Sequence, residues 1–123
     1  MRVGLKDKKF SWKRLVNSFK YAFTGIKTAY LGEQNLRIHT IMAILVIICG
    51  FLFKISYMEW LICLVLIALV LMAEFFNTSI EYLVDLASPG INDLAKAAKD
   101  VASAGVLVLA IISAVSGLII CVP

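Results

Sequence analysis

The sequence predicts an all-α integral membrane protein with an N-terminal amphipathic surface helix and three transmembrane helices. Of the 123 residues, 62% are hydrophobic and 16% are charged, against roughly 25% charged residues in soluble domains. A soluble domain of this size has too little interior for so much apolar surface, because small domains keep a large share of their area exposed. The apolar residues also form three long runs, each able to reach the ~20 residues that span ~30 Å of hydrocarbon.

The positive charges are concentrated near the N-terminus. Nine of the twelve Lys and Arg residues lie within positions 1–37. Because this stretch directly precedes the apolar runs, we interpret it as the charge that holds the N-terminus on the cytoplasmic face of the cell membrane, not as a nucleic-acid-binding region. Residues 1–10 are expected to form a flexible basic tail.

Residues 11–30 are predicted to form the surface helix. Apolar side chains recur there every three or four positions, and polar or basic side chains occupy the opposite face. The apolar set is Trp12, Leu15, Val16, Phe19, Phe23, Ile26 and Tyr30, and the polar set is Lys13, Arg14, Asn17, Lys20, Thr24 and Lys27. Such a helix suits the plane of the membrane interface.

Residues 11–123 are expected to form one membrane domain whose spans cover about 38–53, 60–85 and 100–122. With the N-terminus inside, the chain crosses outward, returns and crosses again, so that the link between the second and third spans is cytoplasmic. The third span is rich in Ala, Ser and Gly, which lets helices approach closely in lipid. Three spans bury little surface by themselves, so a homo-oligomer is expected.

The second span ends in a stripe of polar side chains. At 100° per residue, Glu74, Asn77, Glu81 and Asp85 lie within about 80° of helical arc. Glu74 follows an uncharged run over residues 60–73, and an ionised carboxylate at that depth costs ~2.5 kcal/mol or more. We therefore expect Glu74 to serve as a general base. The alternative is an ion pair with a cation on a neighbouring helix.

Glu81 lies nearer the cytoplasm and is a candidate ligand for Mg²⁺, which usually takes one or two protein carboxylates. Glu33, in an otherwise basic arm, is a candidate for the second carboxylate. Glu33 has an alternative role in balancing the charge of Lys27 or Arg37. Glu81 and Asp85 have a similar alternative, in which they pair with basic residues and hold the helices together.

A second polar cluster comes after the predicted turn at residues 87–90. Lys96, Lys99, Asp100 and Ser103 share one helical face. Folded back across the turn, this face would lie beside the carboxylate stripe, as in a phosphate-and-metal site. The alternative is a solvated segment whose lysines extend to water.

His39 is the only histidine. A zinc site built on histidines is thereby excluded, and we interpret His39 as a solvated side chain at the level of the lipid headgroups. The sequence also lacks both common glycine-rich phosphate loops.

Two segments carry a resemblance to a known family. They are Glu74-x-x-Asn77-x-x-x-Glu81-x-x-x-Asp85 and, after a Pro-Gly turn, Ala95-Lys96-x-Ala98-Lys99-Asp100-x-x-Ser103-Ala104. Together they closely resemble the prokaryotic diacylglycerol kinase family, and the likeness extends over about residues 12–122. The segment Asn77-Thr78-Ser79-Ile80-Glu81 is most similar to the Gram-positive branch of the family, whose members resemble undecaprenol kinases.

The resemblance implies a domain-swapped homotrimer with composite sites between subunits. It also implies residue roles: Glu74 as catalytic base, Asn77 as the residue that orients Glu74 and the lipid hydroxyl, and Glu33 with Glu81 as Mg²⁺ ligands. The implied nucleotide contacts are Arg14, Tyr21, Lys99 and Asp100. The implied cofactor-binding residues are these four together with Glu33 and Glu81. The chain departs from the family at Asn92, where members often carry a histidine.

The resulting hypothesis is a membrane lipid kinase that transfers the γ-phosphoryl group of ATP to undecaprenol, with Mg²⁺ as cofactor. A diacylglycerol kinase is the alternative within the same family. A small proton-coupled exporter is the rival from another class, since it would also place one essential Glu in a span. A purely structural membrane subunit is the third hypothesis, and the buried Glu74 argues against it.

Overall fold

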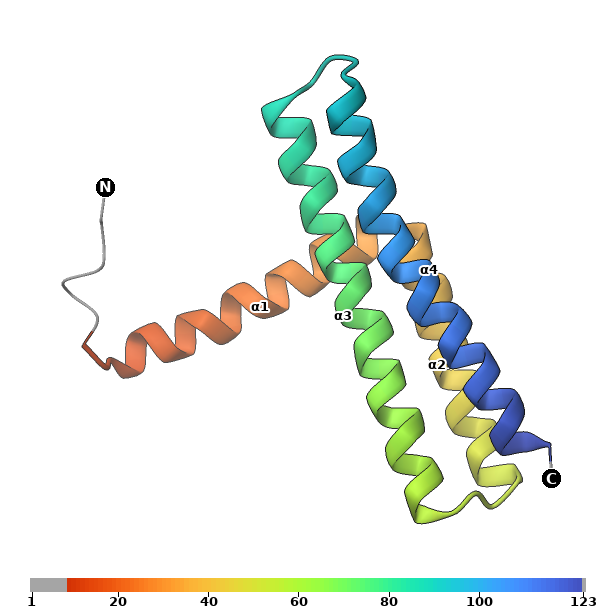
Figure 1. The fold of residues 1–123 in the computed structure, drawn as a ribbon. Coiled ribbons are helices and arrows are strands. Elements are labelled where there is room, and N and C mark those ends of the chain that lie inside the picture. Colours follow the sequence, from red (N-terminus) through yellow and green to blue (C-terminus); the bar gives the residue numbers. More distant parts are fainter. Residues whose placement is uncertain (1–8, 123) are drawn as a thin grey trace. The chain divides into compact units, whose positions relative to one another are not determined.

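The structure, a computed structural model, describes residues 9–122 and consists of helices joined by short connections (Figure 1). Its helices are α1 (Trp12–Gly32), α2 (Gln34–Leu52), α3 (Tyr57–Ala87) and α4 (Asp93–Cys121). No strand occurs within residues 9–122. The predicted all-α class is confirmed. The tail expected over residues 1–10 lies, apart from Lys9 and Phe10, outside the described residues.

The chain divides between Gly32 and Glu33 into two compact units. The first contains α1, whose large apolar side chains, including Trp12, Phe19 and Phe23, are exposed. Near the start of this unit the rings of Phe10 and Trp12 pack edge to face, with centroids 5.0 Å apart. An exposed aromatic face opposite a basic one is typical of a helix that lies in the membrane interface.

The second unit is an antiparallel arrangement of α2, α3 and α4, in which α3 packs against both of the others. Each of the three is long and apolar enough to cross a membrane. Most of their outward-facing large side chains are apolar, among them Ile44, Ile48, Leu64, Val65, Ile112 and Leu118. Such a surface suits hydrocarbon, and only helices with satisfied backbone groups are stable there as single spans.

The α2–α3 turn is formed by a C-terminal motif of α2 and an N-terminal cap of α3. Lys54 adopts a left-handed φ of 52°, and the amide of Ile55 donates to the carbonyl of Gly50 at 3.2 Å, which is the bonding pattern of a Schellman helix end. Ser56 then caps α3: its hydroxyl accepts from the amide of Glu59, whose carboxylate accepts from the amide of Ser56. This capping box sets the start of α3.

Gly50 lets the two helices approach at this turn. A Cβ placed on Gly50 would lie 2.7 Å from Cη2 of Trp60 and 3.1 Å from Cδ1 of Ile55. The Trp60 ring also packs on Phe51, with centroids 4.9 Å apart, so it has little room to withdraw. The close approach at Gly50 therefore depends on the missing side chain.

We expect Gly50→Ala to lower the free energy of unfolding by about 1–3 kcal/mol, the usual cost of overpacking. Unfolding in mixed micelles, followed by Trp fluorescence, measures this change. The matched control is Gly25→Ala, because a Cβ at Gly25 meets no described atom within 4 Å beyond its own helix backbone. A loss of stability in the control equal to that in Gly50→Ala would contradict the packing argument.

Candidate active site

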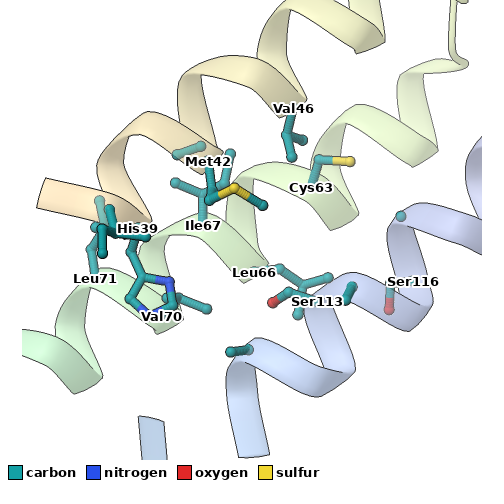
Figure 2. A pocket seen from close by; sticks show the side chains of 15 residues that line it. His39, Met42, Val46, Cys63, Leu66, Ile67, Val70, Leu71, Ser113 and Ser116 are labelled. Atoms are coloured by element: carbon teal, nitrogen blue, oxygen red, sulfur yellow. The ribbon is translucent and has the colours of Figure 1, made fainter. Parts of the chain in front are cut away.

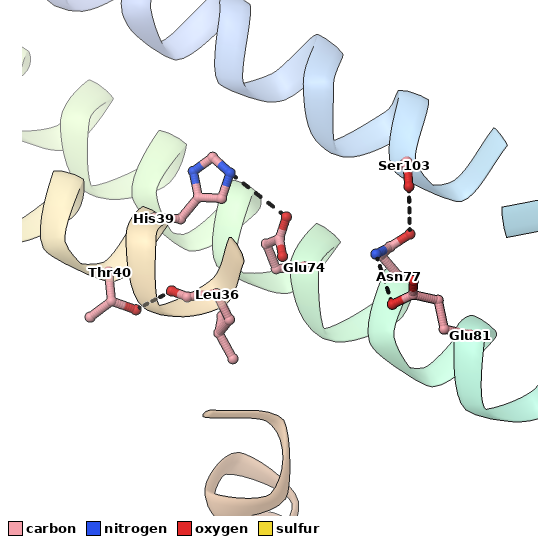
Figure 3. A network of polar contacts seen from close by, with 7 residues as sticks. All are labelled: Leu36, His39, Thr40, Glu74, Asn77, Glu81 and Ser103. Carbon is pink, nitrogen blue, oxygen red and sulfur yellow. Dashed lines mark hydrogen bonds and ion pairs between the residues drawn. The ribbon is translucent and has the colours of Figure 1, made fainter. Parts of the chain in front are cut away.

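Glu74 is the most deeply buried ionisable side chain of α3, with 1% of its surface exposed. Its Oε1 lies 3.7 Å from Nε2 of His39 on α2 (Figure 3). Its Oε2 is buried and has no hydrogen-bond partner within residues 9–122. A buried acceptor without a partner is energetically costly and marks a group that a substrate can satisfy.

The interpretation of His39 as a solvated headgroup-level side chain is wrong. Only 23% of its side chain is exposed, and the α2–α3 packing directs the ring toward Glu74. Sequence reasoning missed this contact because the facing of two helices depends on the turn between them. The sequence feature that could have indicated this contact is the position of His39, a titratable ring at the start of an apolar run.

Asn77 lies one turn beyond Glu74 and is also buried, with 6% exposure. Its Nδ2 donates to Oε1 of Glu81 at 3.4 Å, and its Oδ1 accepts from the hydroxyl of Ser103 at 3.5 Å. The amide thus connects the carboxylate stripe on α3 to α4 (Figure 3). With both ends engaged, Asn77 has a fixed orientation beside Glu74.

Glu33 is the residue that precedes α2, and its extended backbone (φ −124°, ψ 114°) ends the previous helix. Its side chain forms no cap bond with α2. Instead its side chain interacts with that of Glu81, and its charge also acts on Glu74. We call Glu33, Glu74 and Glu81 the acidic cluster.

Two neighbouring carboxylates repel each other, and a proton or a cation between them relieves that repulsion. The Glu33–Glu81 pair therefore provides the one or two carboxylates that Mg²⁺ usually takes from a protein. Within the described part of the chain, no three His, Cys, Asp or Glu side chains converge as a complete metal cage. A metal held here would keep positions for water and phosphate oxygens.

The basic residues of α4 lie beside this cluster. Nζ of Lys99 forms an ion pair of 2.6 Å with Oδ1 of Asp85, across the α3–α4 turn, and its charge also acts on Glu81. Asp100 pairs instead with Lys96 on its own helix, at 2.6 Å. The face of α4 thus folds back on the carboxylate stripe, and its lysines add positive charge at the end of the bundle that holds the acidic cluster.

Asn92 has a defined local role. Its side-chain oxygen accepts from the amides of Leu94 and Ala95, at 2.8 and 3.1 Å, and so caps the N-terminus of α4. Asparagine is among the most favoured residues at this position. Asn92 therefore determines where α4 begins, and so where Lys99 lies along that helix.

Arg14 and Tyr21 lie on α1, in the other compact unit, and both are exposed. The guanidinium of Arg14 donates to the carbonyl of Lys9 at 2.7 Å. The nucleotide contacts assigned to these two residues by resemblance stay predictions.

An apolar cavity of about 350 Å³ lies between α2, α3 and α4 (Figure 2). Its lining includes His39, Val46, Leu66, Val70, Ala114 and Gly117. His39 lines the cavity, and its Nε2 lies 3.7 Å from Oε1 of Glu74, which is not itself among the lining residues. The cavity lining is otherwise almost entirely apolar, which suits a hydrocarbon chain.

Fold and site together define a small membrane enzyme that has an acidic cluster and lysines at one end of three membrane-crossing helices. Comparison with known proteins gives the family. A model of the prokaryotic diacylglycerol kinases matches residues 20–121, and the chain belongs to that family. It is therefore a membrane lipid kinase with ATP as co-substrate, and the predicted family and enzyme class are confirmed.

Individual relatives agree with this assignment. The chain is 42% identical over 118 residues to an undecaprenol kinase of Bacillus subtilis strain 168, and the match covers 96% of each protein. It is 33% identical to a diacylglycerol kinase of Synechocystis, over 89% of this chain and 65% of that protein. It is also 33% identical to a diacylglycerol kinase of Helicobacter pylori strain 26695, over 79% and 76% of the two chains.

Proposed function

We propose that this protein is an undecaprenol kinase that transfers the γ-phosphoryl group of ATP to the hydroxyl of undecaprenol, giving undecaprenyl phosphate and ADP. The observation that carries the chemistry is the buried Oε2 of Glu74, which has no partner among the described residues and belongs to the acidic cluster. The choice of lipid is supported by the undecaprenol kinase of Bacillus subtilis, which matches over 96% of both chains.

In the proposed reaction the lipid hydroxyl gives its proton to Oε2 of Glu74 while its oxygen attacks the γ-phosphorus. The bond from the γ-phosphorus to the bridging oxygen breaks, and ADP leaves with that oxygen. Little covalent chemistry falls to the protein, so positioning and charge stabilisation account for the rate. Asn77, held by Glu81 and Ser103, orients the base and the acceptor hydroxyl.

The residues around the phosphates are those that bring positive charge or bind the metal. We propose that Glu33 and Glu81 hold Mg²⁺, because these two interacting carboxylates repel each other and a cation relieves that repulsion. When bound, Mg²⁺ neutralises phosphate charge. Lys99 contributes a further cation, and Arg14, Tyr21 and Asp100 are proposed to contact the nucleotide by their match to the family.

The assembly is proposed to be a domain-swapped homotrimer with composite sites. Two features support an oligomer: three helices bury little surface, and α4 is rich in small residues that permit close helix packing. We also propose that the protein resides in the cell membrane with its N-terminus and active site in the cytoplasm. The concentration of basic residues before the first span supports that orientation.

Diacylglycerol is the second candidate acceptor, because the relatives from Synechocystis and Helicobacter pylori are diacylglycerol kinases. The proton-coupled exporter has no comparable support, since the relatives described above are all kinases.

Lipid preference tests the proposal. Purified protein in detergent micelles should phosphorylate undecaprenol with a kcat/KM at least about tenfold above that for diacylglycerol, a ratio within reach of an apolar pocket. Reactions without added lipid and reactions with excess chelator serve as controls. Equal or better use of diacylglycerol would keep the kinase mechanism and contradict the proposed substrate.

A further inference from the structure

The two carboxylate oxygens of Glu74 have different surroundings. Oε1 lies 3.7 Å from Nε2 of His39, within ion-pairing range, whereas Oε2 is buried with no partner in the described part of the chain. A glutamate carboxylate rotates about its last torsion with little preference, because that torsion is broad. A contact with one of the two oxygens is therefore needed to determine which oxygen of Glu74 faces the acceptor hydroxyl.

We propose that His39 is a positioning residue that holds Oε1 of Glu74 and thereby presents Oε2 to the acceptor hydroxyl. This inference rests on the proposed role of Glu74 as the base. His39 would not contact the transferred phosphoryl group, so its effect on the reaction passes through Glu74. Asn77, by contrast, is hydrogen-bonded to Glu81 and Ser103 (Figure 3).

The surroundings of His39 support a directed contact. On α3 the charged group that faces His39 is Glu74, and at the start of α2 Glu33 acts on the same carboxylate. On α4 the cavity is lined by small, uncharged residues, among them Ala110, Ser113 and Ala114, of which Ser113 is labelled in Figure 2. Among the described residues, the charged side chain that the imidazole contacts is Glu74, and partners that orient a reactive ligand typically contribute 10–100-fold to activity.

The first test separates kcat from KM. We expect His39→Ala to lower kcat by about 10–100-fold and to change the KM values for lipid and Mg-ATP by less than about twofold. His39→Gln keeps an N–H donor of similar reach and should recover at least about a third of the loss on a logarithmic scale. Thr40→Val is the matched control on the next residue, since the Thr40 hydroxyl bonds to the Leu36 carbonyl of its own helix, and it should stay within about twofold of wild type.

The second test measures the coupling to Glu74. If His39 acts through Glu74, then His39→Ala should lower kcat by less than about twofold in a Glu74→Asp background. The shorter aspartate side chain has already lost the contact with His39. A full additional loss in that background would overturn the inference. So would an unchanged kcat in His39→Ala, or equal losses in His39→Ala and His39→Gln accompanied by a lowered melting temperature in both.

These outcomes are distinguishable from failure of the proposed function. If Glu74→Gln retains wild-type kcat, the assignment of the base fails whatever His39 does. If wild-type protein phosphorylates neither lipid, the kinase proposal itself fails. An additive cycle in an active enzyme contradicts only the role of His39.

Discussion

Glu74→Gln is expected to lower lipid phosphorylation by at least about 10²–10⁴-fold, the usual contribution of a general base. The amide has the same shape as the carboxyl group but takes up no proton at neutral pH. Because Glu74 is buried and one of its oxygens has no partner among the described residues, a neutral side chain costs the fold little. Helix content by circular dichroism and oligomer size should therefore match the wild type. Transfer of labelled γ-phosphate measures the activity.

Glu59→Gln is the matched control for this substitution. It makes the same chemical change in α3, but in the first turn of the helix, where Glu59 belongs to the capping box with Ser56. Glutamine also serves in such a box, so activity should stay near that of the wild type. Near-normal turnover by Glu74→Gln would show that another group takes the proton.

The second large effect is expected from the carboxyl pair. Glu33→Gln and Glu81→Gln should each raise the Mg²⁺ concentration for half-maximal activity by about tenfold or more, because each removes one of the two carboxylates that Mg²⁺ usually takes from a protein. The double variant should be much less impaired than the product of the single effects, since both act on one site. Titration of activity with Mg²⁺ at fixed ATP measures these shifts.

The outcome that would contradict this account is an unchanged Mg²⁺ dependence in both single variants. That result would leave Glu33 and Glu81 with the alternatives considered for them in the sequence, in which each balances the charge of basic residues. The Glu59→Gln protein again controls for the change from a carboxylate to an amide. It should titrate with Mg²⁺ as the wild type does.

The presence of the helices could be predicted from the sequence because long apolar runs dominate it. The positions of the helix ends depend on a different interaction. The apolar runs indicate which residues suit hydrocarbon, whereas capping bonds determine where a helix begins. Ser56 with Glu59 starts α3 at Tyr57, and Asn92 starts α4 at Asp93, so both helices extend beyond the apolar runs.

The candidate site could likewise be predicted only in part. The stripe over residues 74–85 follows from helical periodicity alone, because all its members lie on one element. Contacts between elements do not follow from periodicity. Glu33 with Glu81 and His39 with Glu74 depend on how α2 packs on α3, which the turn near Gly50 and Trp60 determines. The family resemblance supplied the Glu33–Glu81 pair, whereas the structure alone brought out His39.

The most direct test of the central claim is transfer of labelled γ-phosphate from Mg-ATP to undecaprenol, measured side by side for the purified wild type and Glu74→Gln. The account predicts labelled undecaprenyl phosphate from the wild type and none above background from the variant, with both proteins equally folded and assembled. Absence of labelled lipid from folded wild-type protein, or equal labelling by the two proteins, would contradict it.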